Sequence, residues 1–372
     1  MQRDIRFIIK QFQIGGELAE ARPYGSGHIN DTYVVICNHN GECVRYILQK
    51  INHYVFKDPA GLMENIMRVT EHIHNKLKSE KTSDLSRRVM TVISTKDDRS
   101  YYKDSEGNFW RLYTFIENAR TFDLPESLDH IYEAARAFGV FEKMLLDLPG
   151  PPLHETIAGF HNGPERFRTF KQAVEDDVCN RAEGVKNEIE FLLKNGWIFD
   201  VSPQLVESGR IPVRITHNDT KINNVMIDDK SGKGLCVIDL DTVMSGLSLY
   251  DFGDIMRTTV TSASEAERDL SKVQVEMPRF EAVVKGYLSA AGEFLNETER
   301  DNLVHGAKMM SLIMGTRFLT DYLLGDRYYK IDFESHNLDR CRTQLKLFES
   351  VTEQQERMNT IVEKVFKKDI TI

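Results

Sequence analysis

Cysteines are few and long apolar runs are missing in this chain of 372 residues. The five cysteines are odd in number and none has C-x-x-C spacing, so neither a disulfide framework nor a zinc cage is expected. No stretch approaches the roughly 18 apolar residues of a membrane span. The apolar run near the N-terminus is too short for the core of a signal peptide. We therefore expect reduced thiols in a cytoplasmic protein.

An excess of basic residues is also missing. Lysine and arginine number 48 against 57 acidic residues, which gives a formal net charge of −9. Proteins that bind nucleic acids or anionic membranes need a basic surface. We therefore expect neither a nucleic acid nor a membrane as a partner, and no feature of the sequence predicts a protein partner. The fractions of 41% apolar and 28% charged residues are ordinary for a globular protein.

The first 116 residues show the patterns of short strands. Apolar and β-branched runs predict them before Gly25 and over residues 33–37, 43–51, 89–94, 101–102 and 109–116. Asn40-Gly41 is typical of a hairpin turn. Asp58-Pro59 is a plausible helix start, and apolar residues then recur at helical spacing to Leu77. The order β-β-β-helix-β-β predicts a small antiparallel sheet with one inserted helix.

Residues 117–372 are predicted to be mainly helical. Helical spacing appears over residues 128–145, 165–194, 280–291, 297–324 and 335–367. Short strands interrupt it over residues 213–215, 224–227 and 235–240. The fold class predicted is α+β with two lobes: a β-rich lobe of residues 1–116 and a larger helical lobe of residues 117–372. A hairpin inside a helical lobe often marks a functional site.

That interruption contains His217, Asp219 and Asn224 in the pattern H-x-D-x-x-x-x-N, the spacing of a phosphoryl-transfer catalytic loop. A carboxylate at Asp219 would accept the proton of an attacking hydroxyl. The amide oxygen of Asn224 suits Mg²⁺, a hard cation that prefers oxygen ligands. Asp239 ends the next strand, and its carboxylate would be a second ligand of the Mg²⁺ ion. The alternative is that Asp219 and Asn224 are turn or capping residues.

Three further residues are predicted to support this loop. His217 is expected to orient the loop through a hydrogen bond rather than to transfer protons. Asp251 begins a D-F-G triplet, but only Asp239 follows a short hairpin, so Asp251 is expected to support the loop or cap a helix. Asp241, two residues after Asp239, is placed with it as a supporting carboxylate.

The nucleotide is expected to contact the β-rich lobe. The turn with Gly25 and Gly27 can present backbone N–H groups to phosphates, although Gly-x-Gly is also an ordinary hairpin turn. Lys50 is a candidate phosphate ligand, but strand alternation could instead put Gln49 on the ligand face. The segment from Thr114 to Ile116 leaves the last strand and would offer backbone groups to adenine.

On these motifs the chain resembles the aminoglycoside phosphotransferase/choline kinase group of small-molecule kinases, although Asn218 replaces the usual glycine. Within that group it looks most like the N-acetylhexosamine 1-kinases. The segments that carry this resemblance begin at Tyr46, His217, Val237, Tyr250, Met314 and Gly325. The resemblance implies a two-lobed protein-kinase-like fold, with ATP as co-substrate and Mg²⁺ as cofactor. It also implies that His28, Arg317 and Tyr328 lie near the sugar.

The function implied is phosphorylation of the anomeric hydroxyl of N-acetylglucosamine or N-acetylgalactosamine. One alternative is the same chemistry on an aminoglycoside, choline, homoserine or a ribose derivative. The other is a non-catalytic nucleotide-binding pseudokinase, which the presence of Asp219, Asn224 and Asp239 disfavours.

Overall fold

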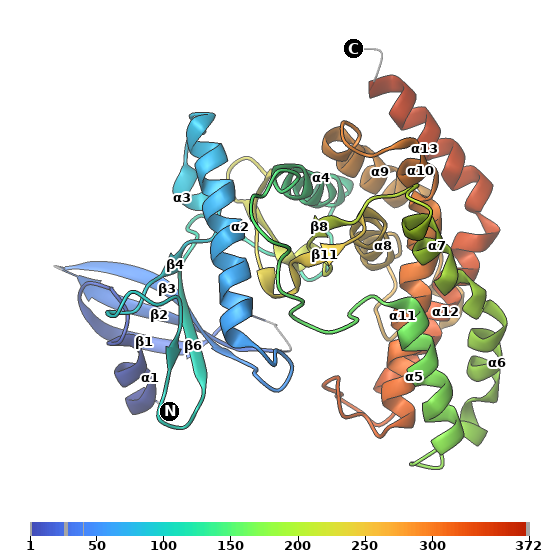
Figure 1. The fold of residues 1–372 in the computed structure, drawn as a ribbon, viewed down its shortest axis with the longest axis horizontal. Coiled ribbons are helices and arrows are strands. Elements are labelled where there is room, and N and C mark those ends of the chain that lie inside the picture. Colours follow the sequence, from blue (N-terminus) through green and yellow to red (C-terminus); the bar gives the residue numbers. More distant parts are fainter. Residues whose placement is uncertain (1, 26–28, 40, 370–372) are drawn as a thin grey trace. The chain divides into compact units, whose positions relative to one another are not determined.

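The computed structural model describes residues 2–25, 29–39 and 41–369, and their contacts divide the chain into two compact units (Figure 1). Unit 1 consists of Met1–Ala119, Asp147–Ala158 and Leu235–Met244. Unit 2 consists of Arg120–Leu146, Gly159–Gly234 and Ser245–Ile372. The boundary between residues 116 and 117 stays a prediction, and two later segments of the chain pack with unit 1.

Unit 1 is built on an antiparallel sheet with the strand order β1-β2-β3-β6-β4, in which β5 also pairs with β6. The strands are β1 (Glu17–Pro23), β2 (Asp31–His39), β3 (Glu42–Ile51), β4 (Val92–Ile93), β5 (Tyr102–Lys103) and β6 (Phe109–Thr114). The predicted hairpin joins β2 to β3. Gly41 has a φ of +90° in its turn, a conformation that glycine adopts at little cost. Asn40 lies outside the described residues.

The two faces of this sheet carry different side chains. In an antiparallel register, directly paired residues share a face, so Leu48 lies beside Leu112 and Lys50 beside Trp110. This face packs against α1 (Gln2–Ile9), a helix that the sequence analysis did not predict. The other face carries Arg111, whose Nη1 lies 4.0 Å from Met63 Sδ of α2 (Pro59–Ser79).

Helix α2 begins as predicted. The Asp58 carboxylate accepts the N–H of Gly61 at 3.0 Å, and Pro59 occupies the first turn, where its missing N–H costs nothing. A short helix, α3 (Leu85–Arg88), follows it. One helix of substantial length thus comes between the third and fourth strands of unit 1.

Unit 2 is mainly helical, as predicted. Its longer helices are α4 (Leu128–Met144), α5 (Gly163–Asp176), α6 (Lys186–Asn195), α8 (Ser248–Thr259), α9 (Met277–Ala291), α11 (Leu303–Leu323), α12 (His336–Glu353) and α13 (Gln355–Asp369). Its short helices are η1 (Ala182–Val185), η2 (Gly196–Asp200), α7 (Val201–Glu207), η3 (Ile222–Asn224), η5 (Leu270–Lys272) and α10 (Glu297–Asp301). Helix α11 lies between α5, α8 and α12 (Figure 1) and is almost entirely buried.

The continuous helix expected over residues 165–194 is wrong. The structure divides this stretch into α5, η1 and α6. Asp177 and Asn180 adopt left-handed backbone conformations, with φ of 35° and 54°, and such residues end a right-handed helix. Amphipathic spacing on both sides of the break hid it in the sequence.

Short strands interrupt the helices where the sequence predicted them. They are β8 (Arg214–Thr216), β9 (Val225–Asp228) and β10 (Gly234–Val237), with β7 (Ala119–Arg120) before them and β11 (Met244–Gly246) after them. The short helix η4 (Leu240–Thr242) follows β10. None of the helices in the described ranges is both long and apolar enough to cross a bilayer.

Candidate active site

The loop between β8 and β9 carries His217, Asp219 and Asn224, and a buried carboxylate lies beneath it. Asp251, in the first turn of α8, accepts the backbone N–H of His217 at 2.8 Å and that of Asn218 at 2.7 Å. The Thr220 hydroxyl donates to the backbone carbonyl of Asp251 at 2.6 Å. Asp251 is 1% exposed, so its two hydrogen bonds compensate for burying an acceptor. They fix the backbone just before Asp219.

Asn218 adopts a φ of +63°, the left-handed conformation that a glycine would take without strain. Its amide oxygen accepts from the Thr216 hydroxyl at 2.9 Å. Asparagine tolerates this conformation better than most residues because its short polar side chain bonds locally. Asn218 therefore adopts at this position the backbone conformation that a glycine would adopt.

Asp219 meets two groups of its own loop. Asn224 Nδ2 donates to the Asp219 carbonyl at 2.8 Å and to its Oδ2 at 3.2 Å. Lys221 Nζ lies 3.2 Å from Oδ1. The sequence analysis did not single out Lys221, although its place two residues after Asp219 was a signal that it shares the loop.

The charge of Asp219 follows from these contacts. Burial alone would favour the neutral acid, but the neighbouring Lys221 and His217 outweigh it, so that the pKa of Asp219 is lowered. The Asp219 carboxylate in turn raises the pKa of Lys221. At neutral pH Asp219 is thus an anion that can accept a hydrogen bond from a hydroxyl.

His217 lies under the loop and away from solvent. Its ring contacts Phe138 and Phe141 edge-on, with centroids 5.2 and 5.7 Å away, and the side chain is fully buried. Nδ1 accepts the backbone N–H of Asp219 at 3.3 Å. These contacts suit an orienting residue.

His161, which the sequence analysis missed, supports the loop from a second side. Its Nε2–H donates to the carbonyl of Asn218 at 2.7 Å. Burial lowers the pKa of His161 to about 3, and the nearby charge of Arg317 adds to the effect, so the ring is neutral. Nothing in the sequence around His161 marked it, because its partner is 57 residues away.

In unit 1, Asp241 is held in a buried network. Arg111 donates to both its oxygens, at 2.9 Å for Nη2 to Oδ2, and Asn30 Nδ2 donates to Oδ2 at 2.7 Å. Arg111 and Asp241 are 1% and 2% exposed. The backbone of Asp239, two residues earlier, has a φ of +58°, and its side chain lies in an exposed position.

The same network distinguishes Gln49 from Lys50. Gln49 Oε1 accepts from Arg111 Nε at 2.9 Å, which places Gln49 on the face of α2 and Asp241. Lys50 lies on the opposite face, with its Nζ 5.9 Å from the centre of the Trp110 ring. Of the two residues that the sequence left open, Gln49 is on the side of the acidic segment.

The remaining nucleotide-binding predictions are partly covered by the structure. Gly25 has a φ of +79°, and a Cβ added there would meet nothing within 4 Å. Gly27 and His28 lie outside the described residues. Thr114 ends β6 and donates its N–H to the carbonyl of Thr91 at 3.0 Å, while Ile116 follows the strand.

The two residues predicted to hold a magnesium ion, Asn224 and Asp239, would offer it an amide oxygen and a carboxylate. Because Asn224 Nδ2 faces Asp219, its Oδ1 accepts no hydrogen bond from any described residue. Within the described ranges, no group of three or more His, Cys, Asp or Glu is arranged to hold a metal. Asn224 and Asp239 fit Mg²⁺ only in a site that nucleotide phosphates complete, which is its usual mode of binding in kinases. They belong to different units, so their pairing stays a prediction.

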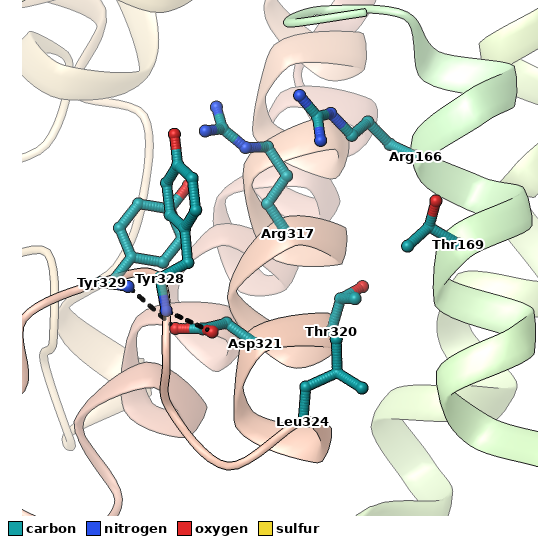
Figure 2. Close-up of a pocket in the computed structure, with 8 residues that line it drawn as sticks. All are labelled: Arg166, Thr169, Arg317, Thr320, Asp321, Leu324, Tyr328 and Tyr329. Atoms are coloured by element: carbon teal, nitrogen blue, oxygen red, sulfur yellow. Dashed lines mark hydrogen bonds between the residues drawn. The ribbon is translucent and has the colours of Figure 1, made fainter. Parts of the chain in front are cut away.

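Unit 2 also contains a pocket of about 170 Å³. Its lining residues, drawn in Figure 2, are Arg166, Thr169, Arg317, Thr320, Asp321, Leu324, Tyr328 and Tyr329. Arg317 and Tyr328, two of the three predicted sugar ligands, therefore line one pocket. The Arg317 guanidinium lies 4.7 Å from the centre of the Phe160 ring, next to His161.

A model of the phosphotransferase enzyme family matches residues 20–283 of the chain. The chain belongs to this family. It is thus an enzyme that transfers a phosphoryl group, and the predicted membership of the wider kinase group is confirmed. The family match does not extend to the acceptor, so the resemblance to N-acetylhexosamine 1-kinases stays a prediction.

Solved structures of similar fold include several small-molecule kinases. A microcompartment-associated aminopropanol kinase has a TM-score of 0.57 at 14% identity, over 96% of this chain and 99% of that one. An aminoglycoside phosphotransferase from Alicyclobacillus acidocaldarius gives 0.56 at 10%, over 98% and 96%. A spectinomycin phosphotransferase in complex with ADP and spectinomycin gives 0.51 at 13%, over 100% and 98%. At these identities the similarity shows the fold, and the predicted fold class is confirmed.

Proposed function

We propose that this phosphotransferase uses Mg²⁺ and ATP to phosphorylate the anomeric hydroxyl of N-acetylglucosamine or N-acetylgalactosamine. The observation that carries the proposal is the arrangement in unit 2. Asp219 is ionised and contacts Asn224 and Lys221. His161 links Asp219 to the pocket of Arg317, because it donates to the carbonyl of Asn218 in the loop. The charges of both Arg317 and Asp219 also act on the pKa of His161. On the acceptor side, this reaction needs a group that accepts the proton of the sugar hydroxyl and a pocket that binds the sugar.

The reaction balances with groups of this chain. The oxygen of the C1 hydroxyl bonds to the γ-phosphorus while the bond from that phosphorus to the β,γ-bridging oxygen breaks, and ADP leaves. The proton passes to Asp219, late in the step because its pKa is low. Lys221, whose Nζ lies 3.2 Å from Asp219 Oδ1, would keep a positive charge near the reacting hydroxyl. A magnesium ion held by Asn224 and Asp239 would neutralise charge on the β- and γ-phosphates.

The nucleotide is assigned to unit 1. Gly25 and Gly27 would cover its phosphates, with Gln49 near them, and the backbone from Thr114 to Ile116 would contact adenine. The ADP complex of the spectinomycin phosphotransferase, which shares the fold, supports an adenine nucleotide.

The pocket favours a sugar over a cationic acceptor. Two guanidinium groups line it, from Arg166 and Arg317, and both would repel an ammonium group. Tyr328 is 48% exposed and offers a ring and a hydroxyl to a sugar, as His28 would from unit 1. The other candidate is a small amino alcohol or aminoglycoside, which the names of the similar structures favour.

A turnover panel tests the proposal. ATP consumption with Mg²⁺ would be measured with N-acetylglucosamine, N-acetylgalactosamine, glucose, choline, homoserine and kanamycin, and phosphorus NMR would locate the phosphate. We expect a hexosamine 1-phosphate, with kcat reduced about 10²- to 10⁴-fold in Asp219→Asn. Turnover with only kanamycin or choline would contradict the assignment of a sugar as the acceptor. ATP binding without turnover on any acceptor would favour the pseudokinase.

A further inference from the structure

The pocket of unit 2 holds two arginines without a carboxylate partner. Arg166 on α5 donates from Nε to the carbonyl of Phe160 at 3.3 Å. Arg317 on α11 lies 3.4 Å from Met314 Sδ. In the part of the chain that the structure describes, neither guanidinium forms an ion pair. Buried and half-buried arginines usually pair with an acid, so two unpaired ones in one pocket call for a reason.

The two guanidinium groups are close enough to influence each other. Figure 2 shows both side chains directed toward the same end of the pocket. Burial lowers the pKa of Arg166, and the charge of Arg317 adds to that effect. Holding two like charges together costs free energy that a bound anion would recover.

The one acid in the pocket does not neutralise them. The Asp321 carboxylate accepts the backbone N–H groups of Arg327, Tyr328 and Tyr329 at 2.9, 2.8 and 3.0 Å. Asn337 Nδ2 donates to it at 2.9 Å. Asp321 therefore holds the 327–329 segment in place (Figure 2).

A third polar side chain, that of Tyr329, belongs to a residue that lines the same pocket. The Tyr329 hydroxyl is buried and finds no hydrogen-bond partner among the described residues. Burial raises the pKa of Tyr329 to about 12, against the effect of Arg317, so the hydroxyl stays protonated. A buried hydroxyl without a partner is costly, which indicates a ligand that accepts from it.

We propose that the pocket binds an oxyanion carried by the acceptor, so that the preferred substrate is an N-acetylhexosamine with a carboxylate or phosphate substituent away from C1. Arg166 and Arg317 would hold the oxyanion by charge-assisted hydrogen bonds, with the Tyr329 hydroxyl as a further donor. The Thr169 and Thr320 hydroxyls donate to helix carbonyls, at 3.1 and 2.7 Å, and keep lone pairs for sugar hydroxyls. The inference rests on the proposed function, because it assigns this pocket to the acceptor.

Calorimetry without nucleotide tests the inference apart from catalysis. N-acetylglucosamine, its 6-phosphate and N-acetylglucosaminuronic acid would be titrated into the wild-type protein, Arg166→Gln and Arg317→Gln. We expect the acidic sugars to bind about 10- to 100-fold more tightly than the neutral one, and each variant to remove most of that difference. Arg168→Gln is the matched control, because Arg168 lies on α5, is 70% exposed and pairs with Glu165. It should leave all three affinities unchanged.

The outcomes separate the two proposals. A preference for the 6-phosphate alone would assign the site to phosphate, and one for the uronic acid alone would assign it to carboxylate. The inference would be overturned if neutral and acidic sugars bound equally well, or if no sugar bound. It would also be overturned if the variants lost the same affinity for the neutral sugar as for the acidic sugars. If an acidic sugar binds through Arg166 and Arg317 but no phosphate reaches C1, the proposed function fails and the oxyanion pocket remains. Melting curves of the variants identify any that fail to fold.

Discussion

Asn218 shows how one residue fixes the backbone of the loop that carries Asp219. Its φ of +63° costs an ordinary residue roughly 1–2 kcal/mol. Asn218→Ala should therefore lower the free energy of unfolding by about 1–2 kcal/mol and reduce kcat. Asn218→Gly should cost less than about 1 kcal/mol, because glycine adopts this φ freely although two hydrogen bonds to Thr216 are lost. Urea unfolding and kcat for both variants check this; equal stability of the two variants would contradict it.

The Arg111–Asp241 pair makes a second prediction at this scale. Removing one partner of a buried ion pair leaves the other charge uncompensated, so Arg111→Met should lower the free energy of unfolding by about 3–5 kcal/mol. The double variant Arg111→Met/Asp241→Leu should recover much of that loss. Arg22→Met, on the same sheet but 57% exposed at its side chain, is the control and should change it by under about 0.5 kcal/mol. A double variant as unstable as the single one would refute this reasoning.

Residues within one motif were predictable, and residues joined only by the fold were not. The H-x-D-x-x-x-x-N spacing predicted that Asp219 and Asn224 share one site, and the loop does bring the Asn224 amide to Asp219, while their roles stay a prediction. Strand alternation kept Gln49 as an alternative to Lys50, and Gln49 meets Arg111. Arg111 itself was missed, since its partner is 130 residues away and a buried arginine has no local pattern.

At the scale of elements, strand β11 lies so close to β8 and the residues after it that only glycine fits at position 246. A Cβ added to Gly246 would lie 2.1 Å from Thr216 Oγ1 and 2.6 Å from Asn218 Oδ1. Gly246→Ala should displace the start of the loop, reduce kcat at least tenfold and cost about 1–3 kcal/mol. Gly184→Ala is the matched control, because a Cβ there meets nothing within 4 Å. The measurements are kcat and the melting temperature of both variants. Equal values for Gly246→Ala and Gly184→Ala would refute the close approach of the two strands at Gly246.

Elements with complete local signals were predicted, and those that depend on packing were not. Helix α2 has a capping aspartate, a proline at its start and apolar residues at helical spacing from Leu62 to Leu77. Helix α1 has eight residues, which is marginal without tertiary contacts, and it is held by the apolar face of the sheet. The break after α5 depends on two left-handed residues, Asp177 and Asn180, of types that also occur inside helices.

At the scale of the whole molecule, the sequence predicted two lobes but not how the chain is shared between them. Composition shifts from strand to helix patterns near residue 116. The segments Asp147–Ala158 and Leu235–Met244 nevertheless pack with unit 1, because their partners, such as Asn65 and Arg111, lie on α2 and β6. Local sequence patterns do not show which distant segments of the chain pack together in the fold.

The stability of unit 2 should depend on pH through buried acids whose pKa is raised, and Glu142 is one of them. Glu142 of α4 is 1% exposed and accepts the hydroxyls of Ser248 on α8 and Tyr287 on α9, the latter at 2.6 Å. Burial raises the pKa of Glu142 to about 7, although these hydrogen bonds oppose it. The folded state therefore keeps a proton that the unfolded chain loses near pH 4.5.

The sign follows from this difference. Below pH 4.5 both states are protonated, and between pH 4.5 and about 7 only the unfolded state ionises, so the stability falls as the pH rises. The loss is about 3 kcal/mol by pH 7 and stays constant above it. Glu142→Gln cannot ionise and should gain about that amount over the wild type between pH 5 and 7.5. Urea unfolding of both proteins across this range measures the gain, and a difference that does not change with pH would mean that Glu142 is ionised in the folded state throughout.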